Sequence, residues 1–186
     1  MVDSGKANRL VVWWMKDTLI GHLQIGASEK GLSSIILLGS DAGTPFTTKK
    51  DMGRNSQVER FLERAVDQLT AYFNHTLREF DIPLDISGQT PYTRKILMAT
   101  AAIPYGSVTT YGDLARETGS PNGARAVGGA MRRNPIPIII PCHRVLSSRN
   151  QLHGYSARPG LAAKAKLLEL EGLCVVGEQV LVDDSR

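Results

Sequence analysis

The sequence is poor in cysteine and has no long apolar run. Two cysteines occur in 186 residues, Cys142 and Cys174, and neither belongs to a CxxC pair. This excludes a disulfide framework, and the four dispersed histidines do not predict a closed metal site. The longest apolar runs, 10–15 and 135–141, are much shorter than a membrane span. Without a recognisable secretion signal, we expect a cytoplasmic protein with no membrane partner.

Acidic residues are scarce in the second half of the chain. Residues 1–88 carry 10 Lys and Arg against 11 Asp and Glu, whereas residues 89–176 carry 11 against 4. The halves therefore have net charges of −1 and +7, within a total of +4. This asymmetry indicates two modules, of which the second faces a polyanion. Charge alone leaves an ordinary solvated basic surface equally open.

The first half predicts a small α/β module. Three β-rich runs, at 10–15, 19–25 and 32–38, are separated by polar turns. Apolar residues then follow helical spacing from Val58 to Phe73, with Ser56 as the expected N-cap. Residues 83–86 are a candidate for one more strand. No chemical motif occurs in this half, so we expect it to be a supporting scaffold.

The second half predicts helices joined by tight turns. Thr90-Pro91 should open a helix that runs to about Ala102. Thr110 begins a capping box, and Gly119 ends the short helix that follows. Ser120-Pro121 should start a further helix, which runs to about Arg133. Two short helices around a glycine turn predict a helix-turn-helix.

The second helix of this pair is basic and rich in small residues. Its arginines are Arg125, Arg132 and Arg133, and it has no acidic residue, which favours DNA binding. Glycine inside a helix costs roughly 1 kcal/mol relative to alanine, and a close approach of another backbone would explain why glycines are present here. The small residues are Gly123, Ala124, Ala126, Gly128, Gly129 and Ala130.

Cys142 is the candidate nucleophile. It follows the apolar segment 135–141, which we expect to be strand-like or extended, and it precedes His143 and Arg144. Cationic neighbours lower a thiol pKa and favour the reactive thiolate. A buried cysteine is as often an inert packing residue, and the residues alone leave both readings open. Cys174 lies in an apolar segment with no base nearby, and we expect it to pack in the core.

The sequence Pro141-Cys142-His143-Arg144-Val145 resembles the active-site motif of the O6-alkylguanine-DNA alkyltransferases, which are also called methylated-DNA–protein-cysteine methyltransferases. Asn134-Pro135 precedes the cysteine at the spacing of that family. Three further segments resemble its recognition helix, pocket loop and closing helix, in the same order: Arg125–Met131, Gly154–Ser156 and Leu167–Gly172. The resemblance is strong over about residues 88–173.

The resemblance implies a fold and an activity. The fold would be an α/β domain of the ribonuclease-H type over residues 1–87, a small sheet with a covering helix. A mostly α, winged-helix-like helix-turn-helix domain would follow over residues 88–186. The activity would be single-turnover repair, in which an alkyl group passes irreversibly from O6-alkylguanine, or from O4-alkylthymine, in duplex DNA to the protein's own cysteine. We expect a monomer that needs no cofactor, no metal and no protein partner.

The resemblance also implies roles for the residues around the thiol. Cys142 would be the nucleophile, and His143 would act on it as a base through a water molecule. Glu171 would orient and stabilise His143, although the residues alone also allow a solvated carboxylate, and Glu169 is a rival. Asn134 would hold the reactive turn by side-chain hydrogen bonds.

DNA handling follows from the same resemblance. A thiol cannot reach O6 in a stacked duplex, so the base must be flipped out. Arg125 would fill the gap, and Tyr111 would rotate a phosphate and protonate the leaving guanine at N3. Further residues would contact DNA or line the pocket: Ala124, Ala126 and Gly128 on the helix, and Val145, Tyr155, Ser156, Met131 and Pro137 around the base. Lys164 and Lys166 would be solvated or phosphate-facing charges.

Three other functions remain as alternatives. A non-catalytic sensor of alkyl damage would share this pattern but would lack the cysteine, so Cys142 argues against it. A helix-turn-helix regulator would need base-reading Gln or Asn side chains on its second helix, where Gly, Ala, Val and Met dominate. A Cys-His-Glu hydrolase would turn over repeatedly, whereas an alkyltransferase reacts once per chain.

Overall fold

The computed structural model describes residues 11–38, 56–153 and 160–182. Its N-terminal part is an antiparallel sheet of β1 (Val11–Thr18), β2 (Gly21–Ser28) and β3 (Gly31–Leu38), in that order. The sequence predicted a turn at residues 16–18 and a second strand that begins at Leu19. Instead, β1 continues past an irregularity between Met15 and Thr18, and the turn falls on residues 19 and 20. Ile20 in this turn is buried in the core, and its apolar side chain led to the incorrect prediction of a strand there.

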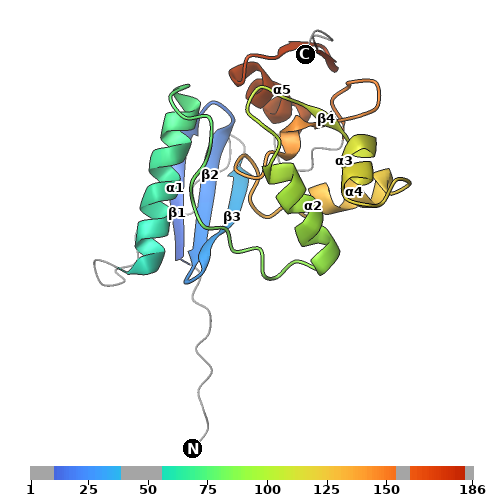
Figure 1. Cartoon of the computed structure of the whole chain (residues 1–186). Helices are drawn as coiled ribbons and strands as arrows, with labels where there is room; N and C mark the ends of the chain where they lie inside the picture. The colour runs from blue at the N-terminus through green and yellow to red at the C-terminus, as the bar shows by residue number, and fades with distance from the viewer. Residues whose placement is uncertain (1–10, 39–55, 154–159, 183–186) are drawn as a thin grey trace, which may run out of the picture.

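Helix α1 (Gln57–Phe73) lies along one face of this sheet and contacts all three strands (Figure 1). Its predicted cap is confirmed, because the Ser56 side chain accepts a hydrogen bond from the Glu59 N–H. The expected strand at 83–86 is only a single parallel bridge from Leu84 to Leu32. Its two backbone hydrogen bonds run from the Leu32 N–H to the Pro83 carbonyl and from the Asp85 N–H to the Leu32 carbonyl.

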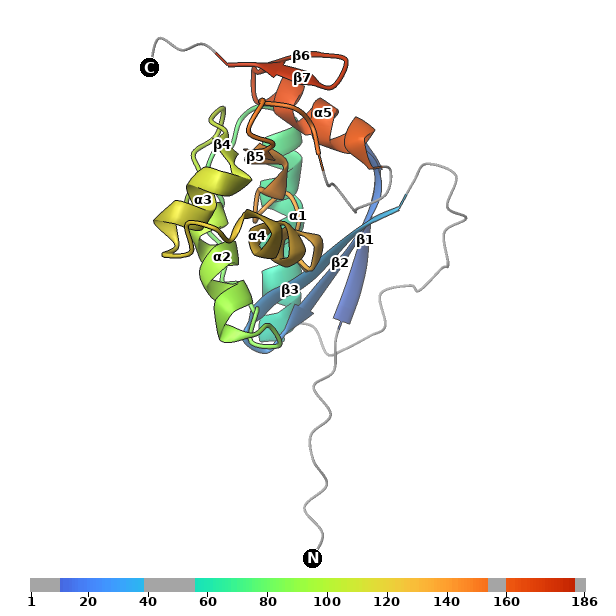
Figure 2. The same ribbon diagram turned by 90° about the vertical axis from the view of Figure 1, so that its right-hand side faces the viewer.

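The second part of the chain is mostly helical, as predicted. Its helices pack together beside the sheet, with β6 and β7 at their outer edge (Figures 1 and 2). Strand β4 pairs in parallel with β5, and β6 pairs antiparallel with β7. The elements are α2 (Pro91–Ala101), β4 (Thr109–Thr110), α3 (Tyr111–Glu117), α4 (Ala124–Arg132), the 3-10 helix η1 (Cys142–Arg144), β5 (Val145–Leu146), α5 (Leu161–Leu170), β6 (Cys174–Val176) and β7 (Gln179–Leu181).

Helices α3 and α4 form the predicted helix-turn-helix pair. Thr110 caps α3 through the Asp113 N–H, and Gly119, at φ 77°, follows its end. The prediction that the next helix starts at Ser120-Pro121 was wrong, since α4 begins at Ala124. Residues 120–123 form a tight turn instead, in which the Gly123 N–H bonds to the Ser120 carbonyl at 2.7 Å. A Cβ at position 123 would lie 2.8 Å from that carbonyl oxygen, so the turn needs glycine.

The apolar segment 135–141 is not extended, contrary to expectation. Its backbone folds back so that the Ile140 N–H bonds to the Ile136 carbonyl, and Ile138 adopts φ 77°, which β-branched residues rarely do. All four isoleucines are buried in a core shared by both parts of the chain. The Pro135 carbonyl also accepts from Ile35 N–H of β3, which fastens this segment to the sheet edge. No helix in the described ranges is long and apolar enough to cross a bilayer.

Candidate active site

Cys142 is the first residue of η1, at the end of the folded-back segment. Asn134 holds this turn from both sides, as predicted. Its amide nitrogen donates to the Ile140 carbonyl at 2.8 Å and to Cys142 Sγ at 3.2 Å, and its amide oxygen accepts from Ile136 N–H. The thiol is almost completely buried, with 7% of the residue exposed. The Cys142 thiol is therefore fixed in place and shielded from bulk water.

The electrostatics of the thiol differ from the expectation. Burial raises the pKa of Cys142, and the opposing influences are the hydrogen bond from Asn134 and the charge of Lys164. The neighbouring cation that we predicted to activate the thiol, Arg144, is bonded to a carboxylate instead. Burial also lowers the pKa of His143, so this side chain is neutral at physiological pH. The resting thiol thus keeps its proton.

His143 and Glu171 form a buried pair. His143 Nε2 lies 2.8 Å from Glu171 Oε1, and both side chains are fully buried. An ionised carboxylate can only accept, so Nε2 carries the hydrogen and Nδ1 keeps the free lone pair. That Nδ1 atom is buried and has no hydrogen-bond partner among the described residues. The rival carboxylate, Glu169, is exposed. The predicted contact between His143 and Glu171 is present, and it leaves the basic nitrogen available.

The Glu171 carboxylate binds three further residues that sequence reasoning had not placed there. Arg144 donates to both oxygens, at 2.8 and 2.9 Å, and also to the Ile103 carbonyl. The Gly106 N–H donates to Oε2 at 3.2 Å, and the Tyr72 hydroxyl donates to Oε1 at 2.7 Å. The hydrogen bonds and charges of His143 and Arg144 outweigh burial and lower the pKa of Glu171 to about 2. Glu171 is therefore an ionised acceptor of five hydrogen bonds.

Lys164 is not a solvated charge, and that prediction was wrong. It is fully buried on α5, and its ammonium donates to the Val145 carbonyl at 2.6 Å and to the His153 carbonyl at 3.1 Å. Burial lowers its pKa to about 8. The chain tolerates the charge because two carbonyls satisfy it and the face of Tyr111 lies 6.0 Å away. Lys166, by contrast, is exposed, as expected.

Tyr111 is the first residue of α3 and lies on the thiol side of the site. Its hydroxyl donates to the His153 carbonyl at 3.1 Å, the same oxygen that accepts from Lys164. Burial and the neighbouring Cys142 raise its pKa to about 12, so the phenol is protonated. A protonated phenol near the thiol has the chemistry that its predicted role requires.

The predicted DNA-contacting residues lie on α4. Arg125 and Ala126 are exposed, and Ala124 and Gly128 are partly exposed. A Cβ at Gly128 would meet nothing within 4 Å, so packing inside the protein does not require a glycine there. The opposite side of α4 is buried through Val127, Ala130 and Met131. The outer side of the helix thus carries the small residues Ala124, Ala126 and Gly128 beside the exposed Arg125.

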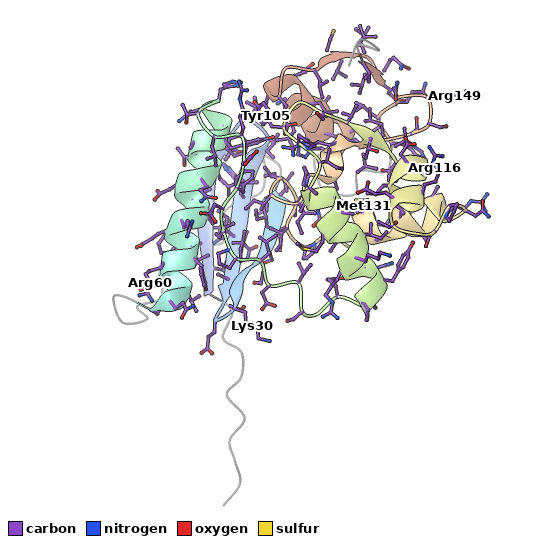
Figure 3. The ribbon with its side chains drawn as sticks, viewed as in Figure 1. Lys30, Arg60, Tyr105, Arg116, Met131 and Arg149 are labelled. Carbon is purple, nitrogen blue, oxygen red and sulfur yellow. The ribbon has the colours of Figure 1, made fainter. Side chains whose placement is uncertain are left out.

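The predicted pocket residues divide into two groups. Val145, Met131 and Pro137 are buried, and the Met131 sulfur accepts a hydrogen bond from Thr100 (Figure 3 labels Met131 beside α2 and α4). Tyr155 and Ser156 lie outside the described residues.

Cys174 is exposed on β6, so the prediction that it packs in the core was wrong. The described residues contain no cluster of three or more His, Cys, Asp or Glu that could hold a metal ion.

Two family models match the chain. The first is described as the ribonuclease-like domain of 6-O-methylguanine DNA methyltransferase and matches residues 11–86. The second, the DNA binding domain of the same protein, matches residues 91–173. Together they span both parts of the fold, including the Cys142, His143 and Glu171 positions. The chain belongs to the O6-methylguanine-DNA methyltransferase family.

Relatives of this methyltransferase family match along most of their length. A methylated-DNA–protein-cysteine methyltransferase of Methanosarcina acetivorans is 40% identical over 153 residues, which are 78% of this chain and 96% of the relative. The Mycobacterium leprae protein of the same name is 48% identical over 119 residues, 64% of this chain and 70% of the relative. The family therefore includes this chain in both its domains.

Solved structures of the methyltransferase family share the fold. The O6-methylguanine methyltransferase of Mycobacterium tuberculosis has a TM-score of 0.70 at 34% identity, covering 88% of this chain and 93% of that one. The Mycobacterium tuberculosis protein in complex with DNA has a TM-score of 0.69 at 36% identity, covering 85% and 90%. The two-domain architecture expected from the sequence is confirmed.

The buried Glu171 carboxylate should dominate the acid stability of this methyltransferase-family chain. Its pKa is about 2 instead of 4.5, so its contribution is complete above pH 4.5 and is lost as the pH falls toward 2. That contribution is about 3 kcal/mol of unfolding free energy. Glu171→Gln should be less stable at pH 7 and should lack this part of the pH dependence. Urea unfolding of both proteins from pH 2 to 7 measures the difference, and parallel curves would contradict an ionised carboxylate.

Proposed function

We propose that this chain repairs DNA by transferring the alkyl group of O6-alkylguanine in duplex DNA to Cys142. The observation that carries this assignment is the arrangement around the thiol. A clamped cysteine stands in the methyltransferase motif, next to a histidine whose Nδ1 is free and whose Nε2 is held by an ionised carboxylate. Membership of the family, whose relatives are named as methyltransferases of methylated DNA, supports the same activity.

The chemistry requires one proton transfer and one displacement. His143 Nδ1 takes the thiol proton, through a water molecule, when the substrate is in place. The thiolate sulfur then attacks the alkyl carbon, the bond from that carbon to O6 breaks, and its electrons remain on the guanine. The Tyr111 hydroxyl protonates the departing guanine at N3 and is restored by the proton on His143. In sum, the thiol hydrogen is exchanged for the alkyl group, and the resulting thioether cannot react a second time.

Burial of the thiol fits a protein that reacts only once. The raised pKa of Cys142 keeps the resting sulfur neutral, and a neutral thiol reacts poorly with dissolved electrophiles. A base delivered into the site keeps out bulk water, leaves the one water molecule between the thiol and His143, and brings the alkyl carbon into line with sulfur. The proton moves to His143 only in that arrangement. Premature alkylation by small reagents is thereby suppressed.

Binding to DNA is assigned to α4 and its surroundings. The half of the chain that contains α4 has a net charge of +7, which suits a phosphate backbone. The empty space outside Gly128 allows a nucleic-acid backbone to approach the helix closely. Arg125 is exposed at the start of α4, where it can fill the space left by a flipped base. We propose that a single chain, without a protein partner, carries out this reaction.

The nucleophile assignment can be tested with the two cysteines. Cys142→Ser should bind duplex DNA as before and lose alkyl transfer, because a serine hydroxyl is far less nucleophilic than a thiolate. Cys174→Ser removes the other thiol of the chain, which is exposed on β6, and should transfer normally. Intact mass after incubation with DNA containing O6-methylguanine should show one added methyl group on the wild type and the Cys174 variant. A methylated Cys142→Ser protein would overturn the assignment.

Base flipping can be separated from chemistry by comparing two substrates. Arg125→Ala should slow repair of duplex DNA about 100-fold, since unstacking a base costs a few kcal/mol and each 1.4 kcal/mol is tenfold in rate. The same variant should react with the free base O6-benzylguanine at nearly the wild-type rate, because that base needs no extrusion.

Lys30→Ala is the matched control for the loss of one positive charge. It lies in the β2–β3 turn of the N-terminal domain, at the lower end of the sheet in Figure 3. This variant should repair duplex DNA at close to the wild-type rate. Equal losses on both substrates for Arg125→Ala would mean that Arg125 supports the fold or the thiol and does not stabilise a flipped base.

A further inference from the structure

Tyr72 reaches the active site from the domain that carries no chemical motif. It lies in the last turns of α1 and is 99 residues from Glu171 in sequence, yet its hydroxyl donates to Glu171 Oε1 at 2.7 Å. The ring is fully buried, and Phe80 and Tyr105 contact it with centroid distances of 5.3 and 6.1 Å. Packing therefore fixes the hydroxyl, which is not free to find another partner.

The Tyr72 hydroxyl can only donate in this position. Burial and the negative charge of Glu171 both raise its pKa far above the ordinary value, so the phenol never ionises in the folded protein. Glu171 Oε1 accepts from three groups at once: the Tyr72 hydroxyl, His143 Nε2 and Arg144 Nη2. Each donor takes a share of the charge on that oxygen. Tyr72 therefore competes with His143 for the atom that stabilises a protonated imidazole.

We propose that Tyr72 is a positioning residue of the active site, which fixes the Glu171 carboxylate and weakens its hold on a protonated His143 through their shared oxygen. The inference rests on the proposed function, because it concerns the base of that reaction. Burial already lowers the pKa of His143. Tyr72 acts in the same direction, because a carboxylate that accepts a hydrogen bond from the phenol attracts an imidazolium less strongly. The N-terminal domain thus sets the proton affinity of a base in the other domain.

Other charged and titratable groups face the same pair. Arg144 and Cys142 lie on η1, Lys164 on α5, and Tyr105 on the segment after α2 (Figure 3 shows Tyr105 between α1 and the C-terminal domain). The charges of Arg144 and Lys164 lower the pKa of His143, whereas Glu171 raises it. Tyr105 donates to the Leu170 carbonyl, not to the carboxylate. Tyr105 is therefore a neighbouring phenol that does not bind the shared oxygen.

The test is Tyr72→Phe, with Tyr105→Phe as the matched control. Both variants keep an aromatic ring and lose one hydrogen-bonded hydroxyl, which is buried in Tyr72 and part-buried in Tyr105, but only the first removes a donor from Glu171. In Tyr72→Phe, the pKa of His143 should rise by about 0.5 or more, since the freed oxygen binds the imidazolium more strongly. Tyr105→Phe should leave that pKa unchanged. NMR titration of labelled histidines gives the value without DNA, and a His143→Gln spectrum identifies its signal among the four histidines.

Kinetics provide the second measurement. The rate of transfer from O6-benzylguanine should fall at low pH, and this acid limb should move to higher pH in Tyr72→Phe by the same amount as the pKa of His143. A purely structural role would lower the rate at every pH without moving the limb, and that result would overturn the proposal. If the wild type transfers no alkyl group, the proposed function fails, while the NMR titration still tests the link from Tyr72 to His143.

A fluorinated tyrosine at position 72 guards against a folding defect in Tyr72→Phe. This residue keeps the hydroxyl and its bond to Glu171, but its more acidic O–H donates more strongly. The pKa of His143 should then fall below the wild-type value, opposite to the effect of Tyr72→Phe. Shifts of the same sign in both variants, or no shift in either, would refute the proposal.

Discussion

The buried Glu171 carboxylate is the interaction on which the site depends. A buried charge is tolerated only when donors surround it, and here five hydrogen bonds from four residues do so. Those residues come from α1, the loop after α2, and η1. The carboxylate therefore joins the scaffold domain, the catalytic turn and the end of α5 at one point. Loss of any donor would be felt by His143, because they share the same two oxygens.

The site combines a stable carboxylate with a thiol that is held back. Burial acts on both groups, but with different results. The hydrogen bonds and charges of His143 and Arg144 outweigh it at Glu171, which stays ionised. At Cys142, the Asn134 amide, the charge of Lys164 and two backbone hydrogen bonds do not outweigh it. The difference in hydrogen bonding thus decides which group is charged at rest. It also explains why a free Nδ1 on His143 matters, since the thiol needs a nearby acceptor before it can react.

The sequence was most informative where local rules act. Caps at Ser56, Thr90 and Thr110 placed three helix starts correctly, because a side-chain oxygen beside a free backbone N–H is a local signal. The prediction of an extended 135–141 segment was wrong because an isoleucine run between prolines also suits a buried, folded-back loop. Its positive φ at Ile138 is imposed by tertiary packing and leaves no local trace. The predicted start of α4 was wrong for a similar reason, since Pro121 lies in a turn closed by the hydrogen bond of Gly123 to Ser120.

The site residues show the same limit. The motif around Cys142 pointed to the proposed nucleophile and its histidine, and the resemblance selected Glu171 over Glu169, which agrees with the observed contact between His143 and Glu171. The contacts of Tyr72 and Lys164 were not found. Both lie among apolar residues of their helices, a position where a polar group must find a buried partner. That signal states that a partner exists but not where it is, because the partner of Tyr72 is 99 residues away.

A short, continuous stretch of chain links α4, the helix proposed to contact DNA, to Cys142, the proposed nucleophile. Arg125 stands near the start of α4, the helix ends at Arg132, and Asn134 follows almost at once to clamp Cys142. The buried side of α4 and the buried isoleucines after it belong to the same core. The position of the thiol relative to the helix is therefore set by packed backbone, with no hinge between them. A base displaced by Arg125 would meet a thiol at a fixed place, which reduces the entropy lost in bringing the two together.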